Sequence, residues 1–142
     1  MSLMGVFVAA YLYLYKLGLI GTIVCGTGGC ETVQLSPWSQ FMGVDVALIG
    51  VLGYVVMLAV ALVGLQPAAA MRRWPAHALV LLSGGALLFA AYLTYLELFV
   101  IHAICRWCVV SALIVLGIFI AAVLDWRQAR RIPAIPDPRT YP

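Results

Sequence analysis

The four cysteines of this chain fall into two close pairs. Cys25 and Cys30 enclose the linker Gly-Thr-Gly-Gly, and Cys105 and Cys108 form a C-x-x-C pair. At the start of a helix, residues i and i+3 lie on one face, so the second pair can form a disulfide. The helix dipole and Arg106 favour a thiolate there, whereas burial opposes it. The glycine-rich linker would allow Cys25 and Cys30 to close a small disulfide ring that can move.

These spacings are compatible with three kinds of site. The first is redox exchange between the two pairs, and the second is a set of structural disulfides that pin a loop. The third is a zinc site with four cysteine ligands, because both spacings suit zinc. Covalent haem attachment is not supported, because Val109 stands where a C-x-x-C-H motif requires histidine.

The elements that position these cysteines are membrane helices. The 142 residues are 65% hydrophobic and 9% charged, with a mean hydropathy of +1.11. A soluble domain carries about 25% charged residues, so this composition excludes a soluble enzyme, and so apolar a chain is not disordered. The uncharged stretches predict an all-α integral membrane protein, a bundle of four transmembrane helices. The predicted spans are 3–24, 44–65, 77–102 and 106–126.

The basic residues predict the orientation of the bundle. Arginines stand at 72–73 between the second and third spans and within 127–131 after the fourth, whereas the connection after the first span has no Lys or Arg. The positive-inside rule then places both termini in the cytoplasm. All four cysteines fall on the external side, where disulfides persist. The short basic groups beside apolar runs do not form a nucleic-acid-binding stripe.

Two further segments are predicted at the edges of the bundle. Residues 1–126 form the membrane domain, and the proline-rich residues 127–142 are predicted to be a disordered cytoplasmic tail. In the external loop, Ser36 is typical of an N-cap, and it is followed by proline at the first helical position. The apolar residues Trp38, Phe41 and Met42 then predict a short interfacial helix, either a lid over a pocket or a simple re-entry into the second span.

Two charged residues fall inside predicted spans. Glu97 lies eight residues before Cys105, and Lys16 lies nine before Cys25. At about 1.5 Å per residue, both are about 12–14 Å below the external face. We therefore hypothesise that Lys16 and Glu97 form an ion pair. A structural pair and a part in proton delivery are both compatible with this depth.

Several stretches together resemble the vitamin K epoxide reductase (VKOR) family, particularly its bacterial members. These are CETVQLS (30–36), GV (43–44), GVLGY (50–54) and YLELFVIHAIC (95–105), with C-x-W-C opening the fourth span. The resemblance covers roughly residues 5–126.

The resemblance implies an electron relay that supports disulfide-bond formation in a bacterial inner membrane. An extracytoplasmic thioredoxin-like protein passes two electrons to Cys25 and Cys30. This pair reduces the Cys105–Cys108 disulfide through exchange of Cys30 with Cys105, and Cys108 faces a membrane quinone, ubiquinone or menaquinone. The chain shows no fused thioredoxin-like domain, so the resemblance predicts a separate partner protein.

The candidate quinone contacts are Ser36, Tyr95, Trp107 and Ser111. The resemblance puts Ser36 near the quinone. Tyr95 shares a helix face with other aromatic residues, a pattern that also fits packing, and Trp107 equally fits an interfacial anchor. We predict no metal site. The rival functions are a structural or accessory membrane subunit with structural disulfides, and a membrane protein that binds a metal through its four cysteines.

Overall fold

The computed structural model describes residues 1–22, 26, 29–70 and 72–131 of the chain. Cys25 and the predicted tail beyond Arg131 lie outside the described residues.

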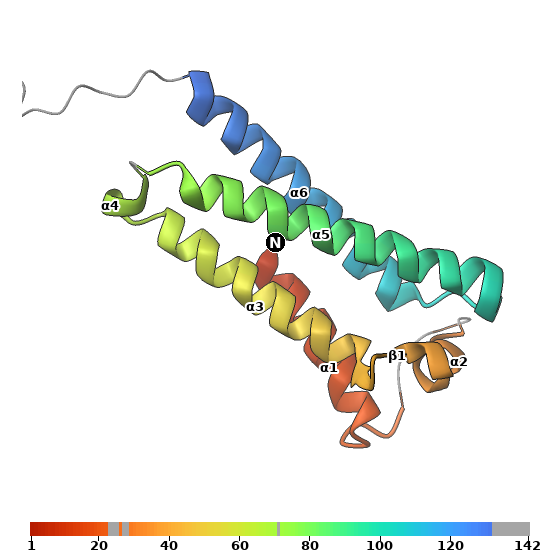
Figure 1. The fold of residues 1–142 in the computed structure, drawn as a ribbon. Helices are drawn as coiled ribbons and strands as arrows, with labels where there is room; N and C mark the ends of the chain where they lie inside the picture. Colours follow the sequence, from red (N-terminus) through yellow and green to blue (C-terminus); the bar gives the residue numbers. More distant parts are fainter. Residues whose placement is uncertain (23–25, 27–28, 71, 132–142) are drawn as a thin grey trace, which may run out of the picture.

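Three long apolar helices form the body of the molecule (Figure 1). They are α3 (Val46–Gly64), α5 (Trp74–Leu96), which continues into the π-helical turn η2 (Glu97–Ile101), and α6 (Arg106–Arg131). Each is long and apolar enough to cross a membrane, as the sequence predicts for the second, third and fourth spans. The short helix α4 (Pro67–Ala70) connects α3 to α5.

The first predicted span is shorter than expected. Helix α1 (Ser2–Lys16) has 15 residues and is therefore about 22 Å long, whereas a spanning helix covers about 30 Å. It ends in a Schellman motif, because Gly18 takes a φ of +75° and its N–H donates to the Tyr15 carbonyl at 2.9 Å. The N–H of Leu19 donates to the Leu14 carbonyl at 3.2 Å. The predicted helix at 3–24 therefore stops at Lys16.

The helices pack as a bundle in which α1 contacts α3 and α6, and α5 contacts α3 and α6. Gly5 allows α1 to approach α3 closely, because a Cβ at this position would lie 2.2 Å from the ring of Tyr54. Tyr54 is 2% exposed and packs in the main apolar cluster with Met57 and Val115. Close packing around one aromatic ring thus joins three helices.

Residues 30–45, called the cap below, cover one end of the bundle. The cap consists of α2 (Cys30–Leu35), the 3-10 turn η1 (Pro37–Ser39), and a hairpin in which β1 (Gln40–Phe41) pairs antiparallel with β2 (Val44–Asp45). Figure 1 shows the cap beside the end of the bundle where α5 turns into α6.

The single interfacial helix expected after Ser36 is not present. The Ser36 hydroxyl donates back to the Val33 carbonyl at 2.8 Å instead of capping a following α-helix. Met42 and Gly43 have φ of 53° and 83°, so both are left-handed, as a tight type I′ hairpin requires. The predicted helical face is thereby divided between a 3-10 turn and a hairpin.

The hairpin is held against the bundle by an aromatic contact. The rings of Phe41 in β1 and Phe89 in α5 meet edge to face, with centroids 5.8 Å apart. This contact positions the cap over the inner side of α5.

At the opposite end, α6 continues through the predicted boundary at residue 126 as far as Arg131. The first part of the predicted tail is therefore helical. Arg130 and Arg131 lie in the last turn, where positive charge interacts favourably with the helix dipole.

Candidate active site

One cysteine of each pair is buried at the capped end of the bundle. Cys30 and Cys105 are both 0% exposed and belong to one cluster with apolar residues of α1 and α2. The absence of a side chain at Gly29 allows this approach, because a Cβ there would lie 2.6 Å from the Cβ of Ala103. Cys30 is disulfide-bonded, whereas Cys105 and Cys108 are free thiols.

Cys105 occupies the N-cap position of α6. Its carbonyl accepts the N–H of Val109 at 3.0 Å, and its Sγ accepts the N–H of Cys108 at 3.3 Å. The sulfur thus satisfies a backbone donor that has no partner within the first helical turn. A hydrogen bond from the Cys108 thiol lowers the pKa of Cys105, and this outweighs the opposing effect of burial. Cys105 is therefore the sulfur of this pair that is favoured as a thiolate.

The π-helical turn η2 directs Glu97 towards both thiols. Glu97 is 4% exposed, and its Oε2 accepts the N–H of Cys105 at 3.1 Å. Its carboxyl group also forms a hydrogen bond with the Cys108 thiol. The turn closes at His102, which has a φ of 53°, and the N–H of Ala103 donates to the Glu97 carbonyl at 3.1 Å. Such π turns are frequent at functional sites.

Lys16 pairs with Asp45, so the expected ion pair with Glu97 is wrong. The Lys16 ammonium contacts the Asp45 carboxylate, and it donates to the Ser39 Oγ at 2.7 Å. Lys16 is the last residue of α1, where the cap reaches it, whereas Glu97 faces the cysteines. The ion pair therefore ties the end of α1 to the cap.

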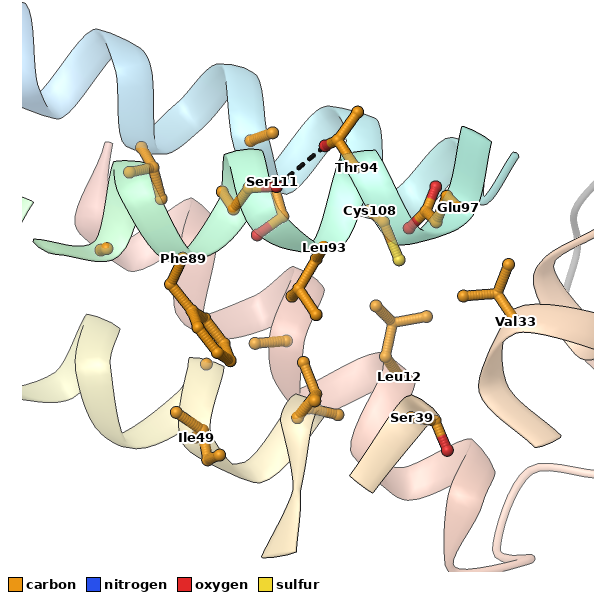
Figure 2. A pocket seen from close by; sticks show the side chains of 18 of the residues that line it. Leu12, Val33, Ser39, Ile49, Phe89, Leu93, Thr94, Glu97, Cys108 and Ser111 are labelled. Atoms are coloured by element: carbon orange, nitrogen blue, oxygen red, sulfur yellow. Dashed lines mark hydrogen bonds between the residues drawn. The ribbon is translucent and has the colours of Figure 1, made fainter. Parts of the chain in front are cut away.

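A cavity of about 360 Å³ lies between the helices and the cap (Figure 2). This volume is in the range of about 300–1,000 Å³ that is typical of small-molecule sites. Most of its wall is apolar. The polar side chains on the wall include Gln34, Ser36, Tyr54, Glu97, Cys108 and Ser111.

The two thiols of the C-x-x-C pair differ in their access to this cavity. Cys108 lines the cavity, and Figure 2 shows its sulfur pointing inward with Glu97 nearby. Cys105 is not part of the wall and is buried instead in the cluster that contains Cys30. One thiol therefore faces the cap cysteine, and the other faces the cavity.

The four predicted quinone contacts are divided between the cavity wall and other surfaces. Ser36 and Ser111 line the cavity. Tyr95 is 56% exposed, lies off the wall and stacks on Phe99 at a centroid distance of 4.8 Å. Trp107 also lies off the wall, with its ring 5.3 Å from that of Tyr11.

Tyr54 lines the cavity and is absent from the predicted contacts. Its hydroxyl lies 2.9 Å from the Ser111 carbonyl and 2.8 Å from the Ser111 Oγ, which joins α3 to α6. A phenolic hydroxyl in the interior of an apolar span needs a hydrogen-bond partner. The position of Tyr54 inside the second predicted span is therefore the sequence feature that could have identified it. The partner depends on helix packing, which the sequence pattern does not give.

Two further features concern the charges and metals of the site. The Arg106 Nη1 would lie 3.1 Å from a Cβ built on Gly26, so this guanidinium group is close to Gly26. Within the described ranges, no three His, Cys, Asp or Glu side chains are grouped so that they could hold a metal ion.

The sequence of this chain matches a known family over most of its length. Residues 1–123 match the sequence model of the vitamin K epoxide reductase family. This range contains all four cysteines and every residue of the cavity wall.

Proposed function

The chain belongs to the vitamin K epoxide reductase family, whose members are membrane disulfide oxidoreductases, and on this premise we propose a specific electron relay. A separate extracytoplasmic thioredoxin-like protein gives two electrons to the pair Cys25/Cys30. These electrons pass to Cys105/Cys108 and then to a membrane quinone, ubiquinone or menaquinone. The result is reoxidation of the soluble protein, which supports disulfide-bond formation.

The observation that carries this proposal is the different surroundings of the two C-x-x-C thiols. Cys105 shares a buried cluster with Cys30, whereas Cys108 lines the cavity. A relay needs this arrangement, because one sulfur must exchange with the loop pair while the other reaches the final acceptor. Two purely structural bridges would not require a thiol at a cavity.

Thiol–disulfide exchange accounts for the internal transfer. A thiolate of the loop pair attacks the Cys105–Cys108 disulfide, and Cys30 and Cys105 form the transient mixed disulfide. The second loop thiol then attacks Cys30, which forms the loop disulfide and releases the C-x-x-C pair as a dithiol. Two electrons have moved from one pair to the other. The N-cap position of Cys105 favours it as the leaving thiolate.

The cavity fits a quinone ring in its chemistry. Its wall is mostly apolar, and its polar residues include Cys108 and Ser111 of α6, Tyr54 of α3 and Glu97. We propose Ser36, Ser111 and Tyr54 as the residues that contact the ring. A bound quinone supplies the capacity to accept two electrons and two protons.

We propose that the protein lies in a bacterial inner membrane with the cysteines on the external side. The arginines at 72–73 and 127–131 then face the cytoplasm, in agreement with the positive-inside rule. Oxidation of the loop pair requires this side, because disulfides persist outside the cytoplasm.

Anaerobic quinone reduction tests the relay. The purified protein is mixed with a reduced thioredoxin-like protein and a soluble ubiquinone or menaquinone analogue, and quinone absorbance is followed. We expect turnover to be abolished in Cys108→Ala and in Cys30→Ala. In Cys108→Ala the remaining Cys105 should also trap a mixed disulfide with Cys30, which mass spectrometry detects. Val109→Ala changes the adjacent exposed side chain and should retain turnover.

Two results would contradict the relay. The first is no turnover with either quinone while the cysteines stay in bridges that resist reductant, which would favour a structural subunit. The second is stoichiometric zinc without quinone-linked turnover, which would favour a metal-binding protein.

A further inference from the structure

We propose that Glu97 carries a proton between the two half-reactions of the relay. The inference rests on the proposed quinone-linked function and assigns a role to an acid that the electron path alone does not use. Reduction of a quinone to a quinol consumes two protons, whereas a thiolate–thiol pair holds only one. Glu97 provides the second.

The position of Glu97 suits this role. Its carboxyl group forms hydrogen bonds with both redox residues, the N–H of Cys105 and the thiol of Cys108. It also lines the cavity beside Cys108. The same acid therefore contacts the groups that release a proton in one half-reaction and the space in which protons are consumed in the other.

The surroundings of Glu97 favour its neutral form. The only ion pair among the described residues is between Lys16 and Asp45, so no cation offsets a charge on Glu97 in that part of the chain. Burial disfavours the charged form of a carboxyl group that no cation neutralises, and the hydrogen bonds with Cys105 and Cys108 oppose this effect only in part.

The titratable groups around Glu97 come from several elements. Cys105 and Cys108 of the α6 start face it, and α2 contributes Gln34, which is uncharged, to the same cavity wall. The charged or titratable residues Glu31, His102 and Arg106 are exposed, and Glu31 forms a hydrogen bond with Tyr15 of α1 rather than with Glu97. The two thiols are therefore the proton-exchanging partners of Glu97.

The oxidising half-reaction balances with one proton from each of two residues. Before it, Cys105 is a thiolate, Cys108 is a thiol and Glu97 is a neutral acid. Cys105 and Cys108 each lose one electron as their S–S bond forms. Cys108 gives up its thiol proton and Glu97 its carboxyl proton, and the quinone leaves as quinol with both electrons and both protons. Glu97 remains as a carboxylate.

The reducing half-reaction restores Glu97. The loop dithiol loses two electrons and two protons when its disulfide forms. The electrons reduce the Cys105–Cys108 disulfide to the thiolate–thiol state. One proton goes to Cys108, and the other returns to Glu97, so the acid is reloaded in every turnover. Tyr54 is less suited to this role, because its hydroxyl is already bound to Ser111.

Substitution of Glu97 by glutamine tests the role without removing the acceptor for the Cys105 N–H. The pre-reduced protein is mixed anaerobically with a soluble quinone, and a single turnover is followed by quinone absorbance over a range of pH. We expect Glu97→Gln to slow this step about 10²-fold, in the range of general-acid catalysis. Reduction of its Cys105–Cys108 disulfide by dithiothreitol should change by less than twofold. Glu31→Gln, the same change at an exposed acid of α2, should leave both steps unchanged.

Infrared spectroscopy provides a test that does not depend on a folded variant. The difference spectrum of the natural protein, reduced minus oxidised, should contain the C=O stretch of a protonated carboxylic acid. The band should shift in frequency in Glu97→Asp, which keeps an acid, and it should disappear in Glu97→Gln if that variant folds.

The outcomes separate this proposal from the relay itself. A single-turnover rate in Glu97→Gln within twofold of the natural protein would refute the proton role while the relay stands. The proton role would also be refuted, and the relay would stand, if the natural protein reduces quinone but its reduced state lacks the carboxylic acid band. Failure of the natural protein to reduce any quinone would instead refute the proposed function.

Discussion

Polar contacts hold both ends of the helix bundle, but they differ in depth. At the cysteine end, formed by the cap and residues 97–108, Glu97 and Cys105 are buried and bonded to each other. At the arginine end, formed by residues 64–70, 72–77 and 125–131, the Trp126 Nε1 donates to the Nε2 of the exposed His77 at 3.0 Å. The Arg130 guanidinium lies 4.0 Å from the centroid of the Trp126 ring.

This difference separates the buried contacts at the proposed redox site from exposed contacts that join two helices. A buried polar group that loses its partner costs the full desolvation penalty, about 1–3 kcal/mol and more for a charge. An exposed partner is replaced by water, so exposed contacts contribute roughly 0–1 kcal/mol. Substitutions at the cysteine end should therefore have the larger effects on both stability and redox activity.

The largest effect is expected from breaking the ion pair between α1 and the cap. Lys16→Met leaves Asp45 without its cation, and Asp45→Asn leaves Lys16 without its anion. The side chains are only 14% and 23% exposed, so either change should cost about 3 kcal/mol. Unfolding in denaturant measures the loss. Because the cap also lines the cavity, the quinone-reduction rate should fall in parallel.

A double-mutant cycle decides whether this cost belongs to the pair. The variant Lys16→Met/Asp45→Asn removes both charges, and it should be more stable than the sum of the two single losses predicts. Additive losses would contradict a direct interaction between the two side chains.

The next largest effect is expected from Gly29→Ala. The new methyl group would lie 2.6 Å from the Cβ of Ala103, so the segments that carry Cys30 and Cys105 must move apart. Overpacking of this kind costs about 1–3 kcal/mol. We also expect slower exchange between the two cysteine pairs, measured by rapid acid quench and mass spectrometry of the thiols. The control is Gly21→Ala, where an added Cβ meets no atom within 4 Å. Equal rates in the two variants would show that this close approach does not govern exchange.

A smaller change concerns the ionisation of Cys105. The hydrogen bond from the Cys108 thiol lowers the pKa of Cys105, so its thiolate should form at a pH below the value of about 8.5 for an ordinary cysteine. In Cys108→Ala this donor is lost, and the pKa should rise, so a higher pH is needed for the same thiolate fraction. The ultraviolet absorbance of the thiolate measures the titration midpoint of Cys105 in the presence and in the absence of Cys108. In both proteins Cys25 and Cys30 are replaced by serine. An unchanged or lower midpoint in Cys108→Ala would contradict the assignment.

The sequence is sufficient for the long helices and for the location of the C-x-x-C pair. Uncharged stretches predict spans at 44–65, 77–102 and 106–126, and the long helices lie at 46–64, 74–101 and 106–131. The agreement follows because length and apolarity are local properties, although the last helix ends more than one turn later than predicted. The uncharged stretches also predict that the third span ends and the fourth begins near residue 105, which places the C-x-x-C pair at the start of the last helix. The same patterns do not predict the end of the first helix. Helix α1 stops before Gly18, although the apolar stretch continues beyond it.

The contacts of the site could not be predicted in the same way. Position along a helix gives the depth of Lys16 and Glu97, but not the direction in which each side chain points. Their real partners, Asp45 and Cys105, depend on the fold of the cap and on a π-helical turn. The hairpin depends on left-handed backbone at Met42, which a methionine rarely adopts. Tertiary packing decides these features.

The smallest effect is expected at the arginine end. The His77 Nδ1 lies 2.7 Å from the Arg73 carbonyl, to which it donates, so the Nε2 is left as the acceptor for Trp126. His77→Ala removes this link between α5 and α6 where water can replace it, so it should cost less than about 1 kcal/mol. Quinone reduction should remain within twofold of the natural protein, because the link lies at the end of the bundle away from the cysteines. Trp126→Phe is the matched variant, because it keeps an aromatic ring but loses the N–H donor. A loss of activity in both variants without a loss of stability would mean that the two ends are coupled, and the contrast between them would no longer hold.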